Sequence, residues 1–386
     1  MATNLDSIPS IDSMRLEAQK KLPRAVFDFI DGGADDEHTL HRNRIDFAHY
    51  HLQPNILKDV SSCSLQSSFL GASSSMPVII SPTGLAGLAW PLAEMLLATA
   101  AKTNDIPFTL AALGSCDIEQ VAAVGHVRKW FQFYVLKDRQ ITLKLIERAL
   151  QAGYETLVLT VDTAVVGKRE KDVHNGFTVP LKWTPRTCWD MISHPHWSLA
   201  TLRAGVPMMR SLTPYAQMDT RSATRHATWI NDAFDSSANW DDIKLIRDSW
   251  PHKLLIKGVL RTDDADRALG AGFDGIVVSN HGGRQLDGAL SSIRALDRIS
   301  AHLDGKLPLI LDSGVRRGSD VVKALCLGAD AVMMGRPTLY GAAAAGQQGV
   351  DKVLSLIREE INRTLALMGV ADINQLDRSY LLNEPQ

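Results

Sequence analysis

The feature of this sequence that most limits its possible folds is an alternation of short apolar runs with stretches of helical period, which begins at residue 76. The runs are rich in β-branched residues and number eight: residues 76–81, 107–113, 130–136 and 156–162, then four that begin at Lys253, Gly275, Pro308 and Ala331. Alternating strands and helices are typical of βα units around a parallel sheet. The pattern therefore predicts an α/β protein with eight parallel strands.

The stretches between the runs carry apolar residues at helical spacing, as residues 141–153 and 319–330 illustrate. Eight βα units favour a closed (β/α)₈ TIM barrel. An open doubly wound sheet is the alternative, but it usually has fewer strands and a glycine-rich dinucleotide turn, and no GxGxxG motif follows the first run. Residues before about 75 should form a helical N-terminal extension, and residues 349–368 a final amphipathic helix.

Length and composition fit one soluble enzyme-sized unit. The chain has 386 residues, 45% of them hydrophobic and 22% charged, and TIM barrels of this size commonly form a single domain, so we expect one domain over residues 1–386. The net charge of −2 favours small-molecule partners over nucleic acid. The cysteines are scattered, which argues against a metal site and against a disulfide framework.

The location of the protein follows from two further features. The first residues lack the charged stretch and apolar run of a signal peptide. No segment reaches about 18 consecutive apolar residues, the length that a membrane-spanning helix requires. We therefore expect a cytoplasmic protein.

Residues 168–240 interrupt the alternation after the fourth run and are too many for an ordinary βα loop. This insert mixes aromatic, methionine and basic side chains with few acids such as Asp219; among them are Trp183, Trp189, Trp197, Met209, Tyr215, Lys182, Arg203 and Arg210. Such a mixture is typical of a segment that contacts a membrane surface. A lid packed on the barrel, or a contact between subunits, explains the insert equally well.

Polar residues gather where the eight strands should end. In chain order they are Thr83, Gln132, Tyr134, Thr160, Asp162, Lys257, Ser279, His281, Asp312 and Arg336. Each has a structural explanation when taken alone, since Asp162 could cap a helix and Lys257 could be a solvated strand end. Catalytic groups of a TIM barrel lie at the C-terminal ends of its strands, so together these residues predict one active site.

The segment SNHGGRQLD, residues 279–287, is the strongest single signal. It places an imidazole, His281, and a guanidinium, Arg284, three residues apart on a glycine-rich turn that lets the backbone approach a ligand. Imidazole suits proton abstraction near neutral pH, and arginine can bind a carboxylate through two parallel hydrogen bonds. The segment therefore indicates a site for a carboxylate that bears an acidic or oxidisable carbon.

The last two strands end in sequences that suit a phosphate. Residues 312–318, DSGVRRG, and the pair Gly335 and Arg336 combine glycine with arginine at the loops that usually cradle phosphate in this fold. The alternative, that Gly314 and Gly335 only permit turns, leaves Arg316 and Arg336 without a role. We expect a phosphorylated cofactor or substrate.

These segments closely resemble the flavin-dependent 2-hydroxy-acid dehydrogenase and oxidase family, which includes glycolate oxidases, lactate dehydrogenases and mandelate dehydrogenases. The resemblance covers nearly the whole chain and rests on SNHGGRQLDG, DSGVRRGSD, LTVD followed by GKRE, FQFYV and SPTG, which stand in the family's order and spacing. The insert and the stretch SWPHKLLIKGV look most like the mandelate dehydrogenases.

The resemblance implies FMN as the cofactor and assigns expected roles to individual residues. The FMN phosphate would lie near Gly314, Arg316, Gly335 and Arg336, and the ring system near Pro82, Thr83, Gly84, Gln132, Thr160, Lys257, Ser279 and Asp312. Lys257 would stabilise negative charge on the reduced flavin, and Asp162 would orient His281, the catalytic base. The substrate's carboxylate and its hydroxyl or keto oxygen would be bound by Arg284 with Tyr134 and Arg169, beside Phe29.

The implied reaction oxidises an (S)-2-hydroxy acid to the 2-keto acid. His281 would take either the hydroxyl proton while hydride leaves C2, or the C2 proton to give a carbanion, and both routes stay open. Electrons would then pass to an acceptor, which we expect to be a quinone or a similar non-oxygen compound reached through the insert. The family also favours a homotetramer and, with a membrane-contacting insert, a peripheral position on the inner face of the cell membrane.

Three positions bear on the substrate. Phe29 and Ala111 stand where the family usually has tyrosine and serine, and Gly84 leaves more room beside the flavin than alanine would. We hypothesise that Phe29 weakens carboxylate binding or shifts the site toward a larger apolar substrate, and an aromatic, mandelate-like acid is favoured. An oxidase that uses oxygen and an L-lactate dehydrogenase remain alternatives within the family. More distant alternatives are a lyase with a Schiff base on Lys257 and a non-catalytic flavin-binding protein.

Overall fold

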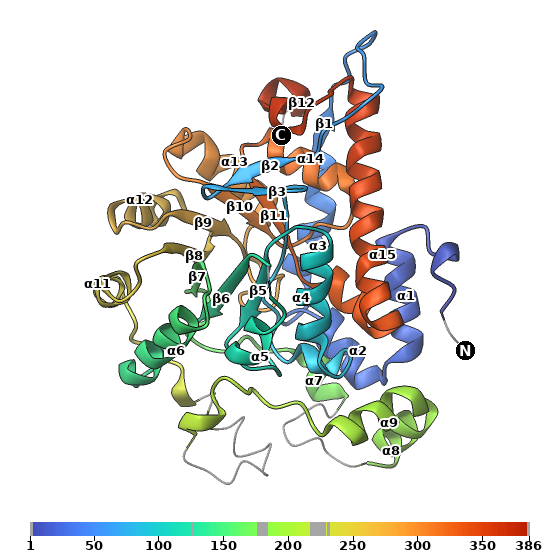
Figure 1. Ribbon diagram of the computed structural model, residues 1–386, viewed down its shortest axis with the longest axis vertical. Helices are drawn as coiled ribbons and strands as arrows, with labels where there is room; N and C mark the ends of the chain where they lie inside the picture. Colours follow the sequence, from blue (N-terminus) through green and yellow to red (C-terminus); the bar gives the residue numbers. More distant parts are fainter. Residues whose placement is uncertain (1–2, 126, 176–183, 217–228, 230–231, 384–386) are drawn as a thin grey trace.

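The computed structural model describes residues 3–125, 127–175, 184–216, 229 and 232–383, and its centre is a closed barrel of eight parallel strands (Figure 1). The strands follow one another around the barrel in chain order. They are β4 (Val78–Ile80), β5 (Phe108–Ala111), β6 (Lys129–Phe133), β7 (Thr156–Thr160), β8 (Lys253–Val259), β9 (Gly275–Val278), β10 (Leu309–Asp312) and β11 (Ala331–Met334). The predicted TIM barrel and the places of its strands are confirmed.

Helices surround the barrel and bury one apolar face each. They are α4 (Ala93–Thr103), α5 (Ile118–Ala122), α6 (Arg139–Gln151), α11 (Asp241–Asp248), α12 (Thr262–Gly270), α13 (Ser292–Leu303), α14 (Gly318–Cys326) and α15 (Arg336–Met368). In α6, the buried residues Thr142, Leu145, Ile146 and Ala149 recur at the spacing of one helix face. The carboxylate of Asp138 accepts a hydrogen bond from the backbone N–H of Gln140 and caps this helix.

The predicted final helix, residues 349–368, is the second part of a longer element. Helix α15 begins at Arg336, directly after β11, and Ala345 and Gly346 have non-helical backbone angles that kink it. Gly346 has a φ of 58°, which glycine adopts without a steric penalty. The kink therefore divides α15 into the helix of the last βα unit and the predicted terminal helix. As a whole, α15 packs against α1 (Ile11–Lys21), α4 and α14.

The N-terminal extension is helical only in part, and this corrects the expectation for residues before about 75. After α1, α2 (Arg24–Asp31) and α3 (His38–Ile45) come three short strands. Strand β1 (Tyr50–Leu52) pairs with β12 (Leu381–Asn383), while β2 (Ser67–Phe69) and β3 (Ala72–Ser74) form a hairpin. The Phe69 ring lies 6.4 Å from that of Trp130, which belongs to the barrel interior. The hairpin therefore covers the end of the barrel opposite α2 (Figure 1).

The insert follows β7 and contains α7 (Glu170–His174), α8 (Pro185–Ser193) and α9 (Pro195–Ala204). Helices α8 and α9 lie beyond the barrel at the end that carries α2 and α7 (Figure 1). The Trp197 indole donates a hydrogen bond of 2.8 Å to the carbonyl oxygen of Leu88 and so ties α9 to the barrel. Lys182, Trp183 and Asp219 lie outside the described residues. Within the described part of the chain, no helix has both the length and the apolarity needed to cross a membrane.

Gly283 is a point where the N-terminal extension is fastened to the barrel. Its carbonyl oxygen accepts a hydrogen bond of 2.8 Å from the backbone N–H of Ala34. Gly283 has a φ of 72°, and a Cβ atom there would lie 2.6 Å from the backbone nitrogen of Leu40. Both facts require glycine at this position.

We predict that Gly283→Ala destabilises the protein by about 2–5 kcal/mol, because a strained backbone adds to a steric clash with the extension. Gly288→Ala is the matched control: Gly288 lies in the same loop, has a φ of 80° and has open space where a Cβ atom would lie. In the control, only the strain of a left-handed backbone should lower the free energy of unfolding, by about 1–2 kcal/mol. Urea unfolding measures both, and equal losses would contradict the proposed fastening.

Candidate active site

The alternation of side chains along each strand places the polar residues in one layer. The lower barrel interior is packed with apolar side chains, among them Trp130, Val158, Leu255, Val277 and Ile310. Two residues further along the same strands, and therefore on the same face, come Gln132, Thr160, Lys257, Ser279 and Asp312. A packed apolar layer thus lies beneath a polar layer at the C-terminal ends of the strands.

A cavity of about 480 Å³ opens above this layer, and it contains most of the residues that the sequence singled out. Its lining includes Phe29, Pro82, Thr83, Gly84, Ala111, Gln132, Tyr134, Thr160, Arg169, Lys257, His281, Arg284, Asp312, Gly314, Arg316, Gly335 and Arg336. Asp162 and Ser279 are not part of the lining; Asp162 lies behind His281, and Ser279 is fully buried beside Lys257. The structure thus brings the predicted residues together, while their roles stay predictions.

His281 and Asp162 form a pair at the wall of the cavity. The Nδ1 atom of His281 lies 2.8 Å from Oδ1 of Asp162, so Nε2 is the ring nitrogen that this contact does not engage. Burial works to raise the pKa of Asp162, but the charges of His281 and Lys257 prevail and hold this pKa below its usual value. An ionised carboxylate in this position favours a proton on Nδ1 and stabilises an imidazolium.

Gly258 makes the close approach of Asp162 possible. It has a φ of 110°, and a Cβ atom there would lie 2.7 Å from Cβ of Asp162. The pairing of β8 with β9 is irregular between Lys257 and Val259, so Gly258 occupies a bulge. The bulge therefore makes room for the carboxylate that holds His281.

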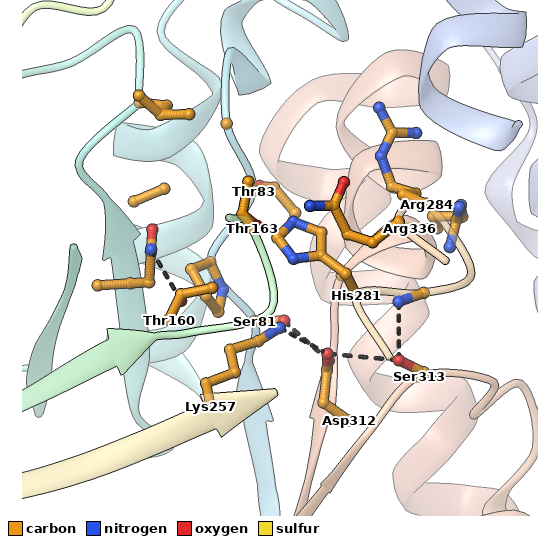
Figure 2. A pocket seen from close by; sticks show the side chains of 18 of the residues that line it. Ser81, Thr83, Thr160, Thr163, Lys257, His281, Arg284, Asp312, Ser313 and Arg336 are labelled. Carbon is orange, nitrogen blue, oxygen red and sulfur yellow. Dashed lines mark hydrogen bonds and ion pairs between the residues drawn. The ribbon is translucent and has the colours of Figure 1, made fainter. Parts of the chain in front are cut away.

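A buried ion pair forms the floor of the cavity, below His281 in the view of Figure 2. The Lys257 ammonium lies 3.1 Å from Oδ2 of Asp312, and hydroxyl groups of Ser279 and Ser81 donate hydrogen bonds of 2.7 and 3.0 Å to the same carboxylate. Burial works to lower the pKa of Lys257, but the charges of Asp312 and Asp162 raise this pKa above its usual value. Lys257 is therefore a fixed cation beneath the ligand.

The wall of the cavity next to His281 is rich in arginine (Figure 2). Arg284 donates hydrogen bonds of 2.7 and 3.1 Å to the carbonyl oxygens of Phe29 and Gly32, at the end of α2. Burial, together with the positive charges of Arg169 and Arg336, holds the pKa of Arg284 well below its usual value. Burial and the charge of Arg316 likewise lower the pKa of Arg336. Repulsion among these cations favours the binding of anions at this wall.

The features expected of an FMN site are present. A cavity of this size falls in the range of about 300–1,000 Å³ that is typical of cofactor sites. The Nε atom of Arg316 is buried and has no hydrogen-bond partner among the described residues, so a phosphate oxygen could serve as its acceptor. Gly314, with a φ of 90°, lies so close to the carbonyl oxygen of Asn43 that a side chain would not fit. The residues present therefore fit the phosphate end of FMN.

Several lining residues escaped the sequence analysis. Asp172 follows Arg169 by three residues on α7 and pairs with it at 2.9 Å, a spacing that could have revealed it. Met209, from the middle of the insert, and Phe234, near its C-terminal end, also line the cavity. Their positions depend on tertiary packing, and no local sequence pattern indicates them. The ring of Phe234, for example, meets that of Tyr134 edge to face, with the ring centroids 4.9 Å apart.

Comparisons with known proteins agree with this geometry. Residues 18–383 match the family described as FMN-dependent dehydrogenase. The chain is 45% identical over 384 residues to the (S)-mandelate dehydrogenase of Pseudomonas putida, covering all of this chain and 95% of that protein. It is 43% identical over 379 residues to the L-lactate dehydrogenase of Alcaligenes faecalis, covering 98% of this chain and 100% of that protein.

Solved structures give the same picture. A crystal structure of the monotopic membrane protein (S)-mandelate dehydrogenase superposes with a TM-score of 0.94 at 44% identity, covering 98% of this chain and 100% of that one. A mandelate oxidase crystallised with (S)-2-phenylpropionate superposes with a TM-score of 0.80 at 32% identity, covering 97% of this chain and 98% of that one.

We predict that Lys257→Met lowers the free energy of unfolding at neutral pH by about 3–5 kcal/mol, because it leaves the Asp312 carboxylate buried without a cation. Burial works to raise the pKa of Asp312, yet Lys257 and Ser279 hold this pKa below its usual value. In the wild-type protein, the Asp312 carboxylate therefore stabilises the fold at pH values above the pKa that it has in the unfolded chain. This stabilisation is lost as the pH falls through the lower pKa that Asp312 has in the folded protein. In the variant the pKa rises, so the deficit should shrink in mild acid.

Urea unfolding of FMN-saturated protein at neutral and mildly acidic pH measures this difference. The double variant Lys257→Met with Asp312→Asn is the control, and it should recover part of the stability at neutral pH. A deficit that is the same at both pH values would show that the lost stability has another source.

Proposed function

Because this chain belongs to the family of FMN-dependent dehydrogenases, we propose that it oxidises an aromatic (S)-2-hydroxy acid to the 2-keto acid and passes the electrons to a non-oxygen acceptor. FMN is its cofactor, and it is an oxidoreductase that acts on 2-hydroxy acids. The observation that carries the proposal is the 2.8 Å contact between His281 and Asp162 beside the guanidinium of Arg284. These groups supply a proton acceptor, its stabilising anion and a carboxylate anchor in one cavity.

An apolar wall supports an aromatic substrate. Leu113, Met209 and Phe234 line the cavity together with Gly84. A Cβ atom at Gly84 would lie 3.3 Å from Cβ of Leu113, so glycine leaves room at this wall. A phenyl group would fill this space, whereas the methyl group of lactate would leave much of the wall without contacts. This difference favours a mandelate-like acid over L-lactate, the substrate named for several relatives.

In the proposed mechanism, Arg284, Arg169 and Tyr134 bind the substrate carboxylate and the neighbouring oxygen. His281 then takes a proton from the substrate, and the Asp162 carboxylate stabilises the imidazolium that forms. Bound FMN would supply the acceptor for the two electrons and the remaining hydrogen of the substrate. The fixed ammonium of Lys257 would stabilise negative charge on that acceptor.

The same proposal assigns the cofactor contacts. Gly314, Arg316, Gly335 and Arg336 would hold the phosphate, and Pro82, Thr83, Gly84, Gln132, Thr160 and Ser279 would surround the ring system, with Asp312 holding Lys257. Gln132 donates a hydrogen bond of 2.9 Å to the Thr160 hydroxyl, which fixes two of these groups relative to each other. The chain would form one domain over residues 1–386 and assemble as a homotetramer, as the family resemblance implies.

The proposal also places the enzyme at the inner face of the cell membrane. Exposed apolar side chains gather on α8, on α9 and just after α9: Trp189 (72% exposed), Ile192 (69%), Leu199 (53%), Leu202 (79%) and Val206 (67%). Such an accumulation on a helical segment suits partial burial among lipid headgroups. A structural relative at 44% identity is itself a monotopic membrane protein. A membrane quinone would then be within reach as the acceptor.

We predict that (S)-mandelate, added without oxygen, bleaches the flavin absorption band of the purified protein faster than (S)-lactate does. The apolar wall should raise kcat/KM for the aryl acid by about tenfold or more. Stopped-flow absorbance measures both rates. Faster bleaching by lactate would contradict the aromatic preference, and a protein that takes up no FMN would contradict the function.

His281→Gln is the control for the chemistry. This variant keeps the polar side chain beside FMN but removes the base, so flavin reduction should slow by a factor of about 10²–10⁴. Its flavin content should stay close to that of the wild-type protein. Unchanged reduction would show that another group accepts the proton.

We predict that replacing Trp189, Ile192 and Leu202 with serine releases the protein from anionic phospholipid vesicles. Each removed side chain should lower the partition coefficient by about tenfold, since each would bury apolar surface in the lipid. Vesicle sedimentation measures the partition. Leu16→Ser with Leu367→Ser is the control, because both side chains are exposed on helices that are not part of the insert. Equal partitioning of the two variants would support a lid or a subunit contact instead.

A further inference from the structure

Phe29 occupies an unusual place between the N-terminal extension and the arginine-rich wall. It lies near the C-terminal end of α2, and its ring lines the cavity. The guanidinium carbon of Arg284 lies over this ring at 5.0 Å from the centroid, and that of Arg169 lies over it at 5.6 Å. One aromatic ring thus contacts both of the arginines assigned to the substrate carboxylate.

Each of these two arginines has its own polar partners, and the Phe29 ring is a neighbour that both share. Arg169 pairs with Asp172 at 2.9 Å. Arg284 has no ion pair with a carboxylate among the described residues, and its Nη1 atom donates to the carbonyl oxygens of Phe29 and Gly32. Mutual repulsion would drive the guanidinium groups apart. The contacts with the Phe29 ring add an attraction that opposes this repulsion before an anion binds.

An aromatic face provides this attraction without using hydrogen-bond donors. The π-electrons attract a cation, and a guanidinium over the ring keeps its N–H groups available at its edge. A carboxylate neighbour, in contrast, occupies N–H groups, as Asp172 does with Nε of Arg169. Among the described residues, the hydrogen bonds of Arg284 use its Nη1 atom, so Nε and Nη2 are available to a ligand.

We propose that Phe29 is a positioning residue for the substrate. Its ring face holds Arg284 and Arg169 in place, so that Nε and Nη2 of Arg284 and the Nη groups of Arg169 stay directed at the carboxylate of a 2-hydroxy acid. The inference rests on the proposed function and adds an electrostatic role to a side chain that has no polar atom. It differs from the expectation that phenylalanine here weakens carboxylate binding or shifts the site toward a larger apolar substrate. The role resides in the electron density of the ring and is separable from its volume.

The test is a series of fluorinated phenylalanines at position 29 in the FMN-bound protein. Each fluorine withdraws electron density from the ring face and changes its shape little, so the attraction for cations falls stepwise. Phenylacetate, a carboxylate without the oxidisable hydroxyl, is the probe, and calorimetry together with the flavin spectrum gives its Kd. We expect Kd to rise with each fluorine, reaching a total increase of about two- to thirty-fold.

Ordinary variants extend the series. Phe29→Leu should weaken phenylacetate binding to a similar extent as full fluorination. Phe29→Trp should keep a high affinity for phenylacetate, because the tryptophan ring attracts cations most strongly. For a substrate that the enzyme oxidises, Phe29→Leu should raise KM more than it lowers kcat. The arginines bind the substrate carboxylate in the ground state and in the transition state alike, so both states lose the same binding energy. A role in folding alone would not give this split.

Two controls isolate the electrostatic effect. Phe27 lies on the same helix beneath the guanidinium of Arg15, at 5.3 Å, and is buried outside the cavity. Fluorination of Phe27 should change the melting temperature and leave the Kd of phenylacetate unchanged. Phenylacetamide, which has the same shape but no charge, should bind the position-29 series with constant affinity.

The inference is overturned if the Kd of phenylacetate does not depend on the number of fluorines at position 29, or if phenylacetamide weakens in parallel. Failure of the proposed function looks different, because then the wild-type protein would not take up FMN or would not be reduced by a 2-hydroxy acid. A wild-type enzyme that oxidises mandelate while the fluorine series stays flat rejects the role of Phe29 alone.

Discussion

The polar layer at the top of the barrel depends on the ion pair between Lys257 and Asp312. Moving either charge from water into this interior alone would cost several kcal/mol, and the pair is tolerated because each charge has its partner at 3.1 Å and further hydrogen bonds. The apolar layer beneath, which includes Trp130, excludes water and strengthens the attraction. A cation is thus fixed at the base of the cavity without any movement of the chain.

The arginine-rich wall follows the opposite rule. Arg284 and Arg336 have no carboxylate within ion-pair distance among the described residues, and backbone carbonyl oxygens at the end of α2 accept their hydrogen bonds instead. The C-terminal end of a helix carries partial negative charge, which offsets part of the repulsion between these cations. The remaining positive potential is available to an anionic ligand. One cavity therefore combines a neutralised cation at its floor with unneutralised cations at its wall.

The sequence predicts those parts of the structure that depend on local periodicity. The ends of the predicted strands located Gln132, Thr160, Lys257 and Ser279, and closure of the barrel brings them to one end. The β2–β3 hairpin escaped prediction because its strands have three residues each and a largely polar sequence. The hydrogen bond from Arg284 to Phe29 escaped as well, since it joins residues 255 positions apart and leaves no local pattern. Spatial neighbours of that kind follow only from the packed fold.

The rim of the cavity joins the N-terminal extension to the base of the insert. The Lys171 ammonium pairs with Glu37 at 2.6 Å, Asn175 donates a hydrogen bond of 2.6 Å to Asp28, and the backbone N–H of Asp35 donates to the carbonyl oxygen of Lys168. At its other end the insert returns through Phe234, which lines the cavity and pairs with Leu136 just beyond β6. Both ends of the insert are thus anchored at the cavity mouth. If the insert docks on a membrane as proposed, the mouth must open beside that surface, so a lipid-soluble acceptor would approach the site over a short path.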